Sequence, residues 1–371
     1  MSKTLQDYAT LINDTIQSNE INHYITTNNM CQNLGGIDTF KNINIPQGKV
    51  RSFQKDDVLL SNIRLYFRKV YRAKQKGGCS SDVLVFRAKH IDSATLFAIL
   101  SSQIFTDYAC SGSQGSKMPR GNKTHMMDFK IPTINFTIAK IFNSIQNKIE
   151  NNHKINELLH KILELLYEQY FVRFDFLDEN NKPYQTSGGK MKFSKELNRL
   201  IPNDFEVKTL GELTQLKVGN KNANHSSNQG KYPFFTCSNN PLRCETYQFE
   251  GKYIIISGNG NFYVTHYDGK FDAYQRTYVV SPNNPNHYVL IYLFVKSYTN
   301  YLKLQFRGSI IKFITKSDIE NIKIVLPNLK TYAKWNNVLK MIENNNKSTQ
   351  TLTALRDFLL PLLLTQQVKP E

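Results

Sequence analysis

Apolar residues recur every three or four positions along two long stretches of the chain, residues 136–172 and 329–365. In the first stretch, alternating steps of four and three residues from Ile138 to Tyr170 meet eight apolar or aromatic side chains in ten positions, and the two exceptions are central asparagines. The second stretch repeats this pattern more weakly, with Arg356 at a core-type position. Such a stripe predicts a helix that buries one face against a partner helix. The two helices pack either on each other, which we favour, or separately on their own domains.

Shorter apolar runs precede each long helix. Four of them have the length and the flanking turn residues of β-strands, at residues 58–63, 81–87, 252–257 and 277–281. Two others carry apolar positions at helical spacing, at residues 92–109 and 287–306. We therefore predict two α+β globules, at residues 1–135 and 205–328. Between them, after the first helix, residues 173–204 are polar and contain Gly188 and Gly189, which predicts a linker over the surface.

Two nearly identical hexapeptides indicate an internal repeat. IENNHK begins at residue 149 and IENNNK at residue 342, which is 342 − 149 = 193 positions later, a spacing that we call the repeat offset. The same offset relates Phe142 to Trp335 and the glycine of one Gly-Ser dipeptide, Gly115, to that of another, Gly308. Each long helix follows a Gly-Ser loop, an apolar strand and a proline in the same order. We predict a pseudo-twofold repeat of globule and helix, joined by the linker. On DNA, such a protein would read two short sites at a set distance.

The charge of the chain favours a polyanionic partner. The formal net charge is +17 and the pI is about 9.5, which suits nucleic acid first and an acidic membrane second. A general lysine-rich bias of the source proteome would explain the same excess. The N-terminal stretch lacks an apolar signal region, and the apolar runs are too short to span a bilayer. We expect a soluble, cytoplasmic protein.

Catalytic motifs give little support for an enzyme. Cys79 follows two glycines and precedes His90, but proximity in sequence does not place a base beside a thiol, so a buried structural cysteine is the simpler interpretation. The sequence contains no Walker motif, no HExxH and no Asn/Asp-Pro-Pro-Tyr/Phe tetrapeptide. The five cysteines form no CxxC pair, so we expect neither a zinc site nor a disulfide framework. We predict no catalytic, cofactor-binding or metal-binding residues in this chain.

Several stretches resemble a known family. GSQGSKMPRGNKTHMMDFKIP at 112–132 and FVRFDFLDENNKPYQTSGGKMKFSKELNRLIP at 171–202 flank the first helix, and DVLLSNIRLYF and GGCSSDVLVF lie in the first globule. With them the chain resembles the specificity subunit of type I restriction–modification systems over essentially its whole length. The weaker seam of the second helix and Pro361 in its last turns depart mildly from the family pattern.

The resemblance implies a non-catalytic subunit with two target-recognition domains. Each globule would bind one half of a bipartite double-stranded DNA target, and the two helices would form an antiparallel coiled coil that sets the gap. The subunit would scaffold two methyltransferase subunits, which restriction subunits join. S-adenosylmethionine, ATP and Mg²⁺ would belong to those partners and not to this chain. A freestanding nucleic-acid-binding scaffold without methyltransferase partners is the alternative, and the neighbouring genes would distinguish the two.

Polar and cationic side chains on turn-rich segments are the candidate DNA contacts, because bases and phosphates are read by such groups on rigid loops. Each segment also has a plain interpretation as a solvated turn. In the first globule the candidates are Asn62, Arg64, Arg68, Ser116, Lys117, Arg120 and Lys123, with Arg120 first. In the second globule they are Asn259, Asn261, Tyr274, Arg276, Arg307, Ser309 and Lys312.

Overall fold

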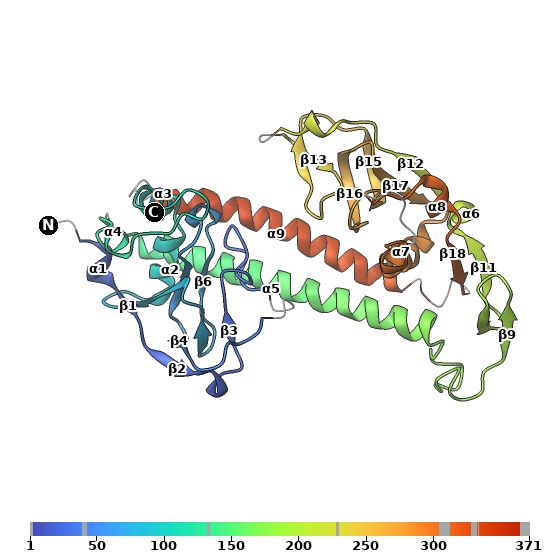
Figure 1. Cartoon of the computed structure of the whole chain (residues 1–371), viewed down its shortest axis with the longest axis horizontal. Helices are drawn as coiled ribbons and strands as arrows, with labels where there is room; N and C mark the ends of the chain where they lie inside the picture. Colours follow the sequence, from blue (N-terminus) through green and yellow to red (C-terminus); the bar gives the residue numbers. More distant parts are fainter. Residues whose placement is uncertain are drawn as a thin grey trace. The chain divides into compact units, whose positions relative to one another are not determined.

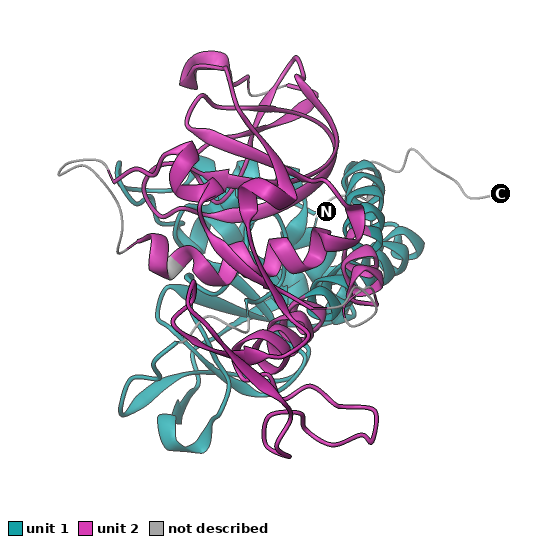
Figure 2. Ribbon diagram, turned by 90° about the vertical axis from the view of Figure 1, so that its right-hand side faces the viewer, with its two compact units in different colours: residues 1–156, 344–371 teal, residues 157–343 magenta. Residues whose placement is uncertain are grey.

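The computed structural model describes residues 3–38, 43–131, 134–227, 230–303, 312–327, 332 and 334–363. Two compact units divide the chain (Figure 2): unit 1 comprises residues 1–156 with 344–371, and unit 2 comprises residues 157–343. The boundary falls inside both long helices, α5 (Phe136–Tyr167) and α9 (Trp335–Leu363). Each unit therefore contains one globule together with a part of each long helix.

Two small sheets form the globule of unit 1 (Figure 1). One has the order β1–β8–β5–β6 and is antiparallel throughout, and the other has the order β2–β4–β7–β3, in which only β3 and β7 run parallel. Their strands are β1 (Ala9–Ile12), β2 (Thr15–Gln17), β3 (Tyr24–Ile25), β4 (Lys49–Phe53), β5 (Val58–Ser61), β6 (Val70–Arg72), β7 (Gly77–Cys79) and β8 (Val83–Ala88). The predicted strands at 58–63 and 81–87 correspond to β5 and β8.

The continuous apolar runs of β5 and β8 are buried on both faces of their sheet. Leu60 and Leu84 face one apolar core and Leu59 and Val85 face another, because successive side chains of a strand point to opposite sides. Helices cover the first of these cores, namely α1 (Leu5–Tyr8), α2 (Ser93–Ser101), α3 (Gln103–Ser111), α4 (Lys123–Met127) and the start of α5. The helix predicted over 92–109 is thus two helices, since Ser102 caps α3 by accepting a hydrogen bond from the backbone N–H of Phe105.

A six-stranded sheet forms the centre of unit 2 (Figure 1), in the order β12–β17–β15–β16–β13–β14. Only β13 and β16 run parallel, through the two residue pairs Phe234–Asp272 and Phe235–Ala273. The unit also contains two separate antiparallel pairs, β9–β10 and β11–β18. The strands are β9 (Met191–Ser194), β10 (Arg199–Pro202), β11 (Glu206–Thr209), β12 (Thr214–Val218), β13 (Tyr232–Phe235), β14 (Leu242–Cys244), β15 (Phe249–Ser257), β16 (Val264–Ala273), β17 (Thr277–Pro282) and β18 (Lys323–Leu326).

Helix α7 (Tyr288–Leu302) lies at the centre of the core of unit 2, where it packs with the end of α5 and the start of α9. Leu163, Leu339 and Ile342 are fully buried in this core. Two short helices, α6 (Leu210–Leu213) and α8 (Lys316–Glu320), complete the unit. Among the residues that the structure describes, no helix combines the length and the apolar character that crossing a membrane requires.

Residues 173–204, predicted as a linker over the surface, are mostly exposed, and a few apolar side chains anchor them to unit 2. A π-helical turn, η3 (Glu168–Val172), ends the first long helix, and Phe174 then enters the core of the unit with 1% of its surface exposed. Ile201, on the β9–β10 hairpin, joins the same core. The segment is polar overall, so its composition hid the few apolar residues that anchor it.

The strand order of the first sheet in unit 1 recurs in unit 2. The order β1–β8–β5–β6 has its counterpart in β12–β17–β15–β16, and each unit also has one parallel pair, β3–β7 or β13–β16. Short helices precede the first strand of each sheet, and the repeat offset relates the start of α4, Lys123, to the start of α8, Lys316. The repeat offset found in the sequence therefore also relates α4 of unit 1 to α8 of unit 2, the short helices that come before the segment leading into each long helix.

Equivalent backbone hydrogen bonds hold each unit together internally. One bond joins the first short helix to the segment before the long helix, and another joins the residue after β5 or β15 to the turn before α4 or α8. In unit 1 these are Leu5 N to Phe129 O and Gly121 N to Asn62 O, and in unit 2 Leu210 N to Ile322 O and Ile314 N to Gly258 O, all between 2.9 and 3.1 Å. The repeat offset relates Phe129 to Ile322 and Gly121 to Ile314.

Within unit 1, α5 and α9 contact each other through polar side chains. The amide of Asn152 donates to Thr349 Oγ1 at 3.1 Å, and the amide of Asn345 donates to Asn156 Oδ1 at 2.9 Å. Nearer the start of α5, Gln146 accepts a hydrogen bond from Arg356 at 3.1 Å. Partner numbers fall along α9 as they rise along α5, so this pairing is antiparallel. The repeat offset relates Asn152 to Asn345 and Asn156 to Thr349, so the two central bonds exchange equivalent positions.

Candidate nucleic-acid interface

In unit 1 the fold brings together the two segments that the sequence singled out. Ile63 forms a β-bridge with Arg120, and Arg64 N donates to Pro119 O at 2.9 Å. The second segment closes on itself, because Gln114 and Arg120 exchange both backbone hydrogen bonds, at 2.9 and 2.8 Å. Gly115, within this closed loop, has a φ of +98°, a conformation that glycine adopts without strain. We call the segments 61–68 and 112–123 together the unit 1 turn cluster.

Four of the seven predicted residues in the unit 1 turn cluster expose their side chains, namely Ser116, Lys117, Arg120 and Lys123. The Arg120 side chain is 62% exposed, and its guanidinium forms an ion pair with Asp82 at 2.9 Å. An exposed ion pair of this kind contributes only about 0.2–1 kcal/mol. Asp82 therefore orients the guanidinium while leaving it accessible to a stronger anionic partner such as a phosphate.

The other three predicted residues, Asn62, Arg64 and Arg68, are partly buried and support the cluster from beneath. The Arg64 guanidinium lies 3.4 Å from Lys117 O, and the Arg68 guanidinium donates to Ser101 O at 2.9 Å. Burial lowers the pKa of Arg68. The Arg68 side chain thus points toward the end of α2 and packs inside the unit. Its neighbours in sequence, a tyrosine and a phenylalanine, gave no sign of this direction.

In unit 2 the predicted segments also converge. Asn259 forms a β-bridge with Phe313, and Gly260 N donates to Lys312 O at 2.9 Å. Gly258 N donates to Arg276 O at 2.7 Å, which places the turn after β16 against the turn after β15. We call these segments, residues 257–263, 273–277 and 312–314, the unit 2 turn cluster. The repeat offset relates Arg120, which forms the β-bridge in the unit 1 turn cluster, to Phe313, which forms the β-bridge in the unit 2 turn cluster. The two clusters therefore hold the same place in their units.

Exposed polar groups line the unit 2 turn cluster. Asn261, Arg276 and Lys312 are exposed, and Asn259 and Tyr274 are partly buried. Asn261 donates to the Tyr263 hydroxyl at 3.0 Å, which fixes its orientation. The predicted residues Arg307 and Ser309 lie outside the residues that the structure describes.

One cation beside the unit 2 turn cluster was missed by the sequence analysis. Lys221 pairs with Tyr274 through a parallel bridge, and Gln275 N donates to Lys221 O at 2.9 Å. This approach requires Gly219, where an added Cβ would lie 2.3 Å from the carbonyl oxygens of Ala273 and Tyr274. The glycine in KVGNK was the available signal, but a single glycine does not show which backbone it approaches.

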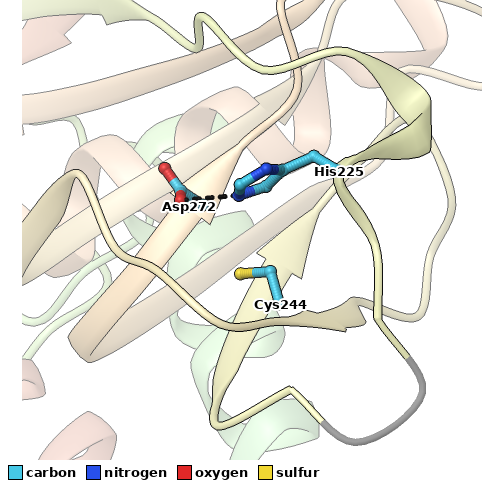
Figure 3. Close-up of side chains that lie close together, drawn as sticks. All are labelled: His225, Cys244 and Asp272. Atoms are coloured by element: carbon cyan, nitrogen blue, oxygen red, sulfur yellow. Dashed lines mark hydrogen bonds and ion pairs between the residues drawn. The ribbon is translucent and has the colours of Figure 1, made fainter.

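A second group of polar side chains lies next to this cluster (Figure 3). His225 comes from the turn η4 (Ala223–His225), Cys244 ends β14 and Asp272 lies near the end of β16. One possible ligand atom from each residue lies within 4.8 Å of the others. The three residues are widely separated along the chain and form no metal-binding motif. The expectation that the chain holds no metal ligands rested on such motifs alone.

Hydrogen bonds and burial define the state of this group. His225 Nε2 lies 3.0 Å from Asp272 Oδ2, and the Thr246 hydroxyl donates to the same oxygen at 2.7 Å. Asp272 and Cys244 are fully buried. Burial raises the pKa of the Cys244 thiol. The Cys244 Sγ lies 3.2 Å from Thr246 O, to which the thiol donates.

Comparison with known proteins finds similarity to DNA specificity subunits of type I restriction enzymes. Residues 202–355 match the family model of the type I restriction modification DNA specificity domain. Over 127 residues the chain is 38% identical to the type I restriction enzyme EcoDI specificity subunit of Escherichia coli, a match that spans 34% of this chain and 28% of that relative. Over 308 residues it is 24% identical to the type I restriction enzyme MjaIX specificity subunit of Methanocaldococcus jannaschii, which spans 74% of this chain and 69% of that relative.

A solved structure shares the fold. The crystal structure of the type I restriction-modification system S subunit from M. genitalium matches 99% of this chain and 96% of its own with a TM-score of 0.63, at 16% sequence identity. The architecture is thus that of a mixed α/β protein with two long helices. The chain is a relative of the type I restriction–modification specificity subunits, and the resemblance predicted from its sequence is confirmed.

Proposed function

We propose that this protein is the non-catalytic DNA specificity subunit of a type I restriction–modification complex, with one recognition domain in each unit. The observation that carries the proposal is the pair of turn clusters. Each is built on the same internal hydrogen bonds, between a strand end and the turn before a short helix, and each presents cationic and amide side chains to solvent. Rigid backbone with exposed arginine, lysine and asparagine suits contacts with base edges and phosphates.

The two clusters share their backbone plan but differ in their side chains. The bridging position holds Arg120 in unit 1 and Phe313 in unit 2, and its partner is Ile63 in unit 1 and Asn259 in unit 2. Two modules with one scaffold and different contact residues would read two different short sequences. We therefore propose a bipartite target whose halves are specified separately. The net charge of +17 supplies the phosphate attraction that any such reading requires.

The long helices are proposed to form the antiparallel coiled coil that sets the unread gap. The exchange of equivalent positions between Asn152–Thr349 and Asn156–Asn345 supports a pseudo-twofold pairing. Polar side chains in the middle of an apolar seam lower stability but permit one register. A fixed register of the two helices would fix the distance between the two recognition domains. A DNA target with an unread gap of constant length requires such a fixed distance.

Exposed apolar residues on α5 are proposed to dock the methyltransferase subunits. Within unit 2, Leu158, Ile162 and Leu165 follow helical spacing and are 61%, 46% and 51% exposed. Such side chains in a row favour a partner surface. The methyltransferase and restriction subunits would supply S-adenosylmethionine, ATP and Mg²⁺ chemistry.

Methylome mapping tests the proposal. The chain is expressed with the methyltransferase encoded beside it in a host that lacks adenine methylation, and modified adenines are located genome-wide. The control is the methyltransferase expressed alone. We expect a split motif, two short defined halves around a fixed gap, that depends on this chain. A contiguous motif, or methylation that is unchanged without the chain, would refute the bipartite reading.

A further inference from the structure

The group formed by His225, Cys244 and Asp272 has the composition of a metal site. It offers an imidazole nitrogen, a thiol sulfur and a carboxylate oxygen, and all three atoms lie within 4.8 Å of one another. Figure 3 shows the His225 ring pointing at the Asp272 carboxylate, with the Cys244 thiol beside this pair. In a tetrahedral site, ligand atoms about 2.0–2.3 Å from zinc lie roughly 3.3–3.7 Å from each other. Small side-chain rotations would therefore close the three donors on one ion.

The burial of Asp272 gives an independent reason to look for a cation. Its exposed fraction is 0%, and its carboxylate uses only Oδ2, which contacts His225 and Thr246. Oδ1 is buried and accepts no hydrogen bond from the described residues. A buried carboxylate is costly unless it is paired with a positive charge. In the described part of the chain no lysine or arginine forms an ion pair with Asp272, whose carboxylate contacts His225 and the Thr246 hydroxyl, and a bound cation would supply the positive charge.

The three elements that supply the donors have a weak connection that an ion would strengthen. The β13–β14 hairpin pairs with β16 through a short parallel ladder of two residue pairs, Phe234–Asp272 and Phe235–Ala273. Cys244 is on the outer strand of this hairpin and Asp272 is at its junction with β16. An ion held by both would attach the hairpin and the turn η4 to the strand that leads directly into the unit 2 turn cluster.

We propose that His225, Cys244 and Asp272 bind one divalent transition-metal ion that anchors the β13–β14 hairpin to β16. The mixed nitrogen, sulfur and oxygen set selects a borderline ion, zinc above all, and disfavours Mg²⁺ and Ca²⁺, which prefer oxygen ligands alone. Three protein ligands leave the fourth position to water or to the Thr246 hydroxyl, which already contacts both His225 and Asp272. The role is structural, and it is independent of which DNA sequence the protein reads.

Cobalt substitution tests the site directly. The full-length chain is treated with a chelator, freed of it, and titrated with Co²⁺, and the thiolate-to-cobalt charge-transfer absorption is recorded together with the bound metal per chain. We expect the wild type to bind one equivalent of Co²⁺, which Zn²⁺ displaces. The charge-transfer band should be lost in Cys244→Ser, and Co²⁺ binding should be lost in His225→Gln. Cys237→Ser is the matched control, because Cys237 lies in the same unit outside the group, and it should bind as the wild type does.

Stability provides a second readout that does not depend on spectroscopy. Zn²⁺ at about 100 times its dissociation constant should raise the Tm of unit 2 in the wild type and in Cys237→Ser by roughly 5–10 °C. It should leave Cys244→Ser unchanged. No cobalt band, or equal binding by Cys244→Ser and wild type, would overturn the proposal and leave a hydrogen-bonded His–Asp–Thr group. Failure of the split-motif experiment would not bear on this outcome, since metal binding is measured without DNA.

Discussion

Replacing Arg120 by alanine should have a small effect on the stability of the protein and a larger effect on its affinity for DNA. The change removes one exposed ion pair with Asp82, which should cost about 0.2–1 kcal/mol of stability. For a unit of this size that corresponds to a fall in Tm of at most about 4 °C. If Arg120 contacts a base, its loss should cost about 1–3 kcal/mol of binding free energy. That loss corresponds to a roughly 5- to 150-fold weaker affinity.

The assay uses the target defined by methylome mapping. The Kd of the full complex is measured on duplexes that carry both half-sites, or one half-site with the other scrambled, across a series of salt concentrations. We expect Arg120→Ala to weaken binding to the half-site read by unit 1 and to leave the other half unchanged. A base contact would relax the preference at one position, whereas a phosphate contact would lower the slope of log K against log salt by about 1.

Arg173→Ala is the matched control. The Arg173 side chain is 68% exposed and ion-paired with Glu168, much as Arg120 is 62% exposed and paired with Asp82. It lies in neither turn cluster. Equal weakening by both variants would show that general charge, and not position, governs binding. Equal loss at both half-sites in Arg120→Ala, or no loss at all, would refute the assignment of Arg120 to one recognition surface.

Three further variants test the framework. Arg356 is 1% exposed, pairs with Asp357, and donates to the buried Gln146 Oε1 and the less buried Asn33 O. Arg356→Leu leaves the buried Gln146 Oε1 unpaired and should lower the free energy of unfolding by about 1–3 kcal/mol in urea melts; an unchanged midpoint would contradict this. Burial lowers the pKa of His266 to about 3, with His160, Lys252 and Lys296 adding to the effect. The unfolded chain therefore binds the extra proton as the pH falls below the ordinary histidine pKa of 6.5, and stability should fall by up to about 1.4 kcal/mol per pH unit between about pH 6.5 and 3. That slope should be shallower in His266→Gln. Insertion of a heptad into both long helices at the Asn156–Asn345 level adds about 10 Å of helix and should lengthen the gap in the methylation motif by about three base pairs; an unchanged gap would show that the helices do not set it.

The long helices and the main strands could be predicted because their information is local. The apolar stripe at 136–172 corresponds to α5 and η3, and the run TYVVS corresponds to β17. The helical spacing of apolar residues over 92–109 continues across Ser102 and gives no sign of a boundary there. The division into α2 and α3 depends on a cap that uses a hydroxyl, which periodicity does not register.

The functional surface was predicted only in part. The stretch GSQGSKMPRGNK was identified as an exposed loop from its glycine, serine and cationic residues. The pairing of Arg120 in this loop with Ile63 is a β-bridge between two segments that lie far apart along the chain. Arg68 is a cationic residue in a turn-rich segment, as expected of a DNA contact, and yet its guanidinium points inward and donates to Ser101 O. The backbone at Arg68 is left-handed, with a φ of 48°, a conformation that composition does not encode.

The sequence by itself determined the repeat offset, the two long helices, the excess positive charge and the resemblance to specificity subunits, because each depends on a pattern that adjacent or evenly spaced residues display. Tertiary structure alone decided which residues meet. It brought Lys221 beside Tyr274, turned residues 173–204 into a folded part of unit 2, and gathered His225, Cys244 and Asp272 from three separate elements. Such contacts follow from strand order and from the approach of backbone segments that are distant in the chain, and no local spacing rule records them.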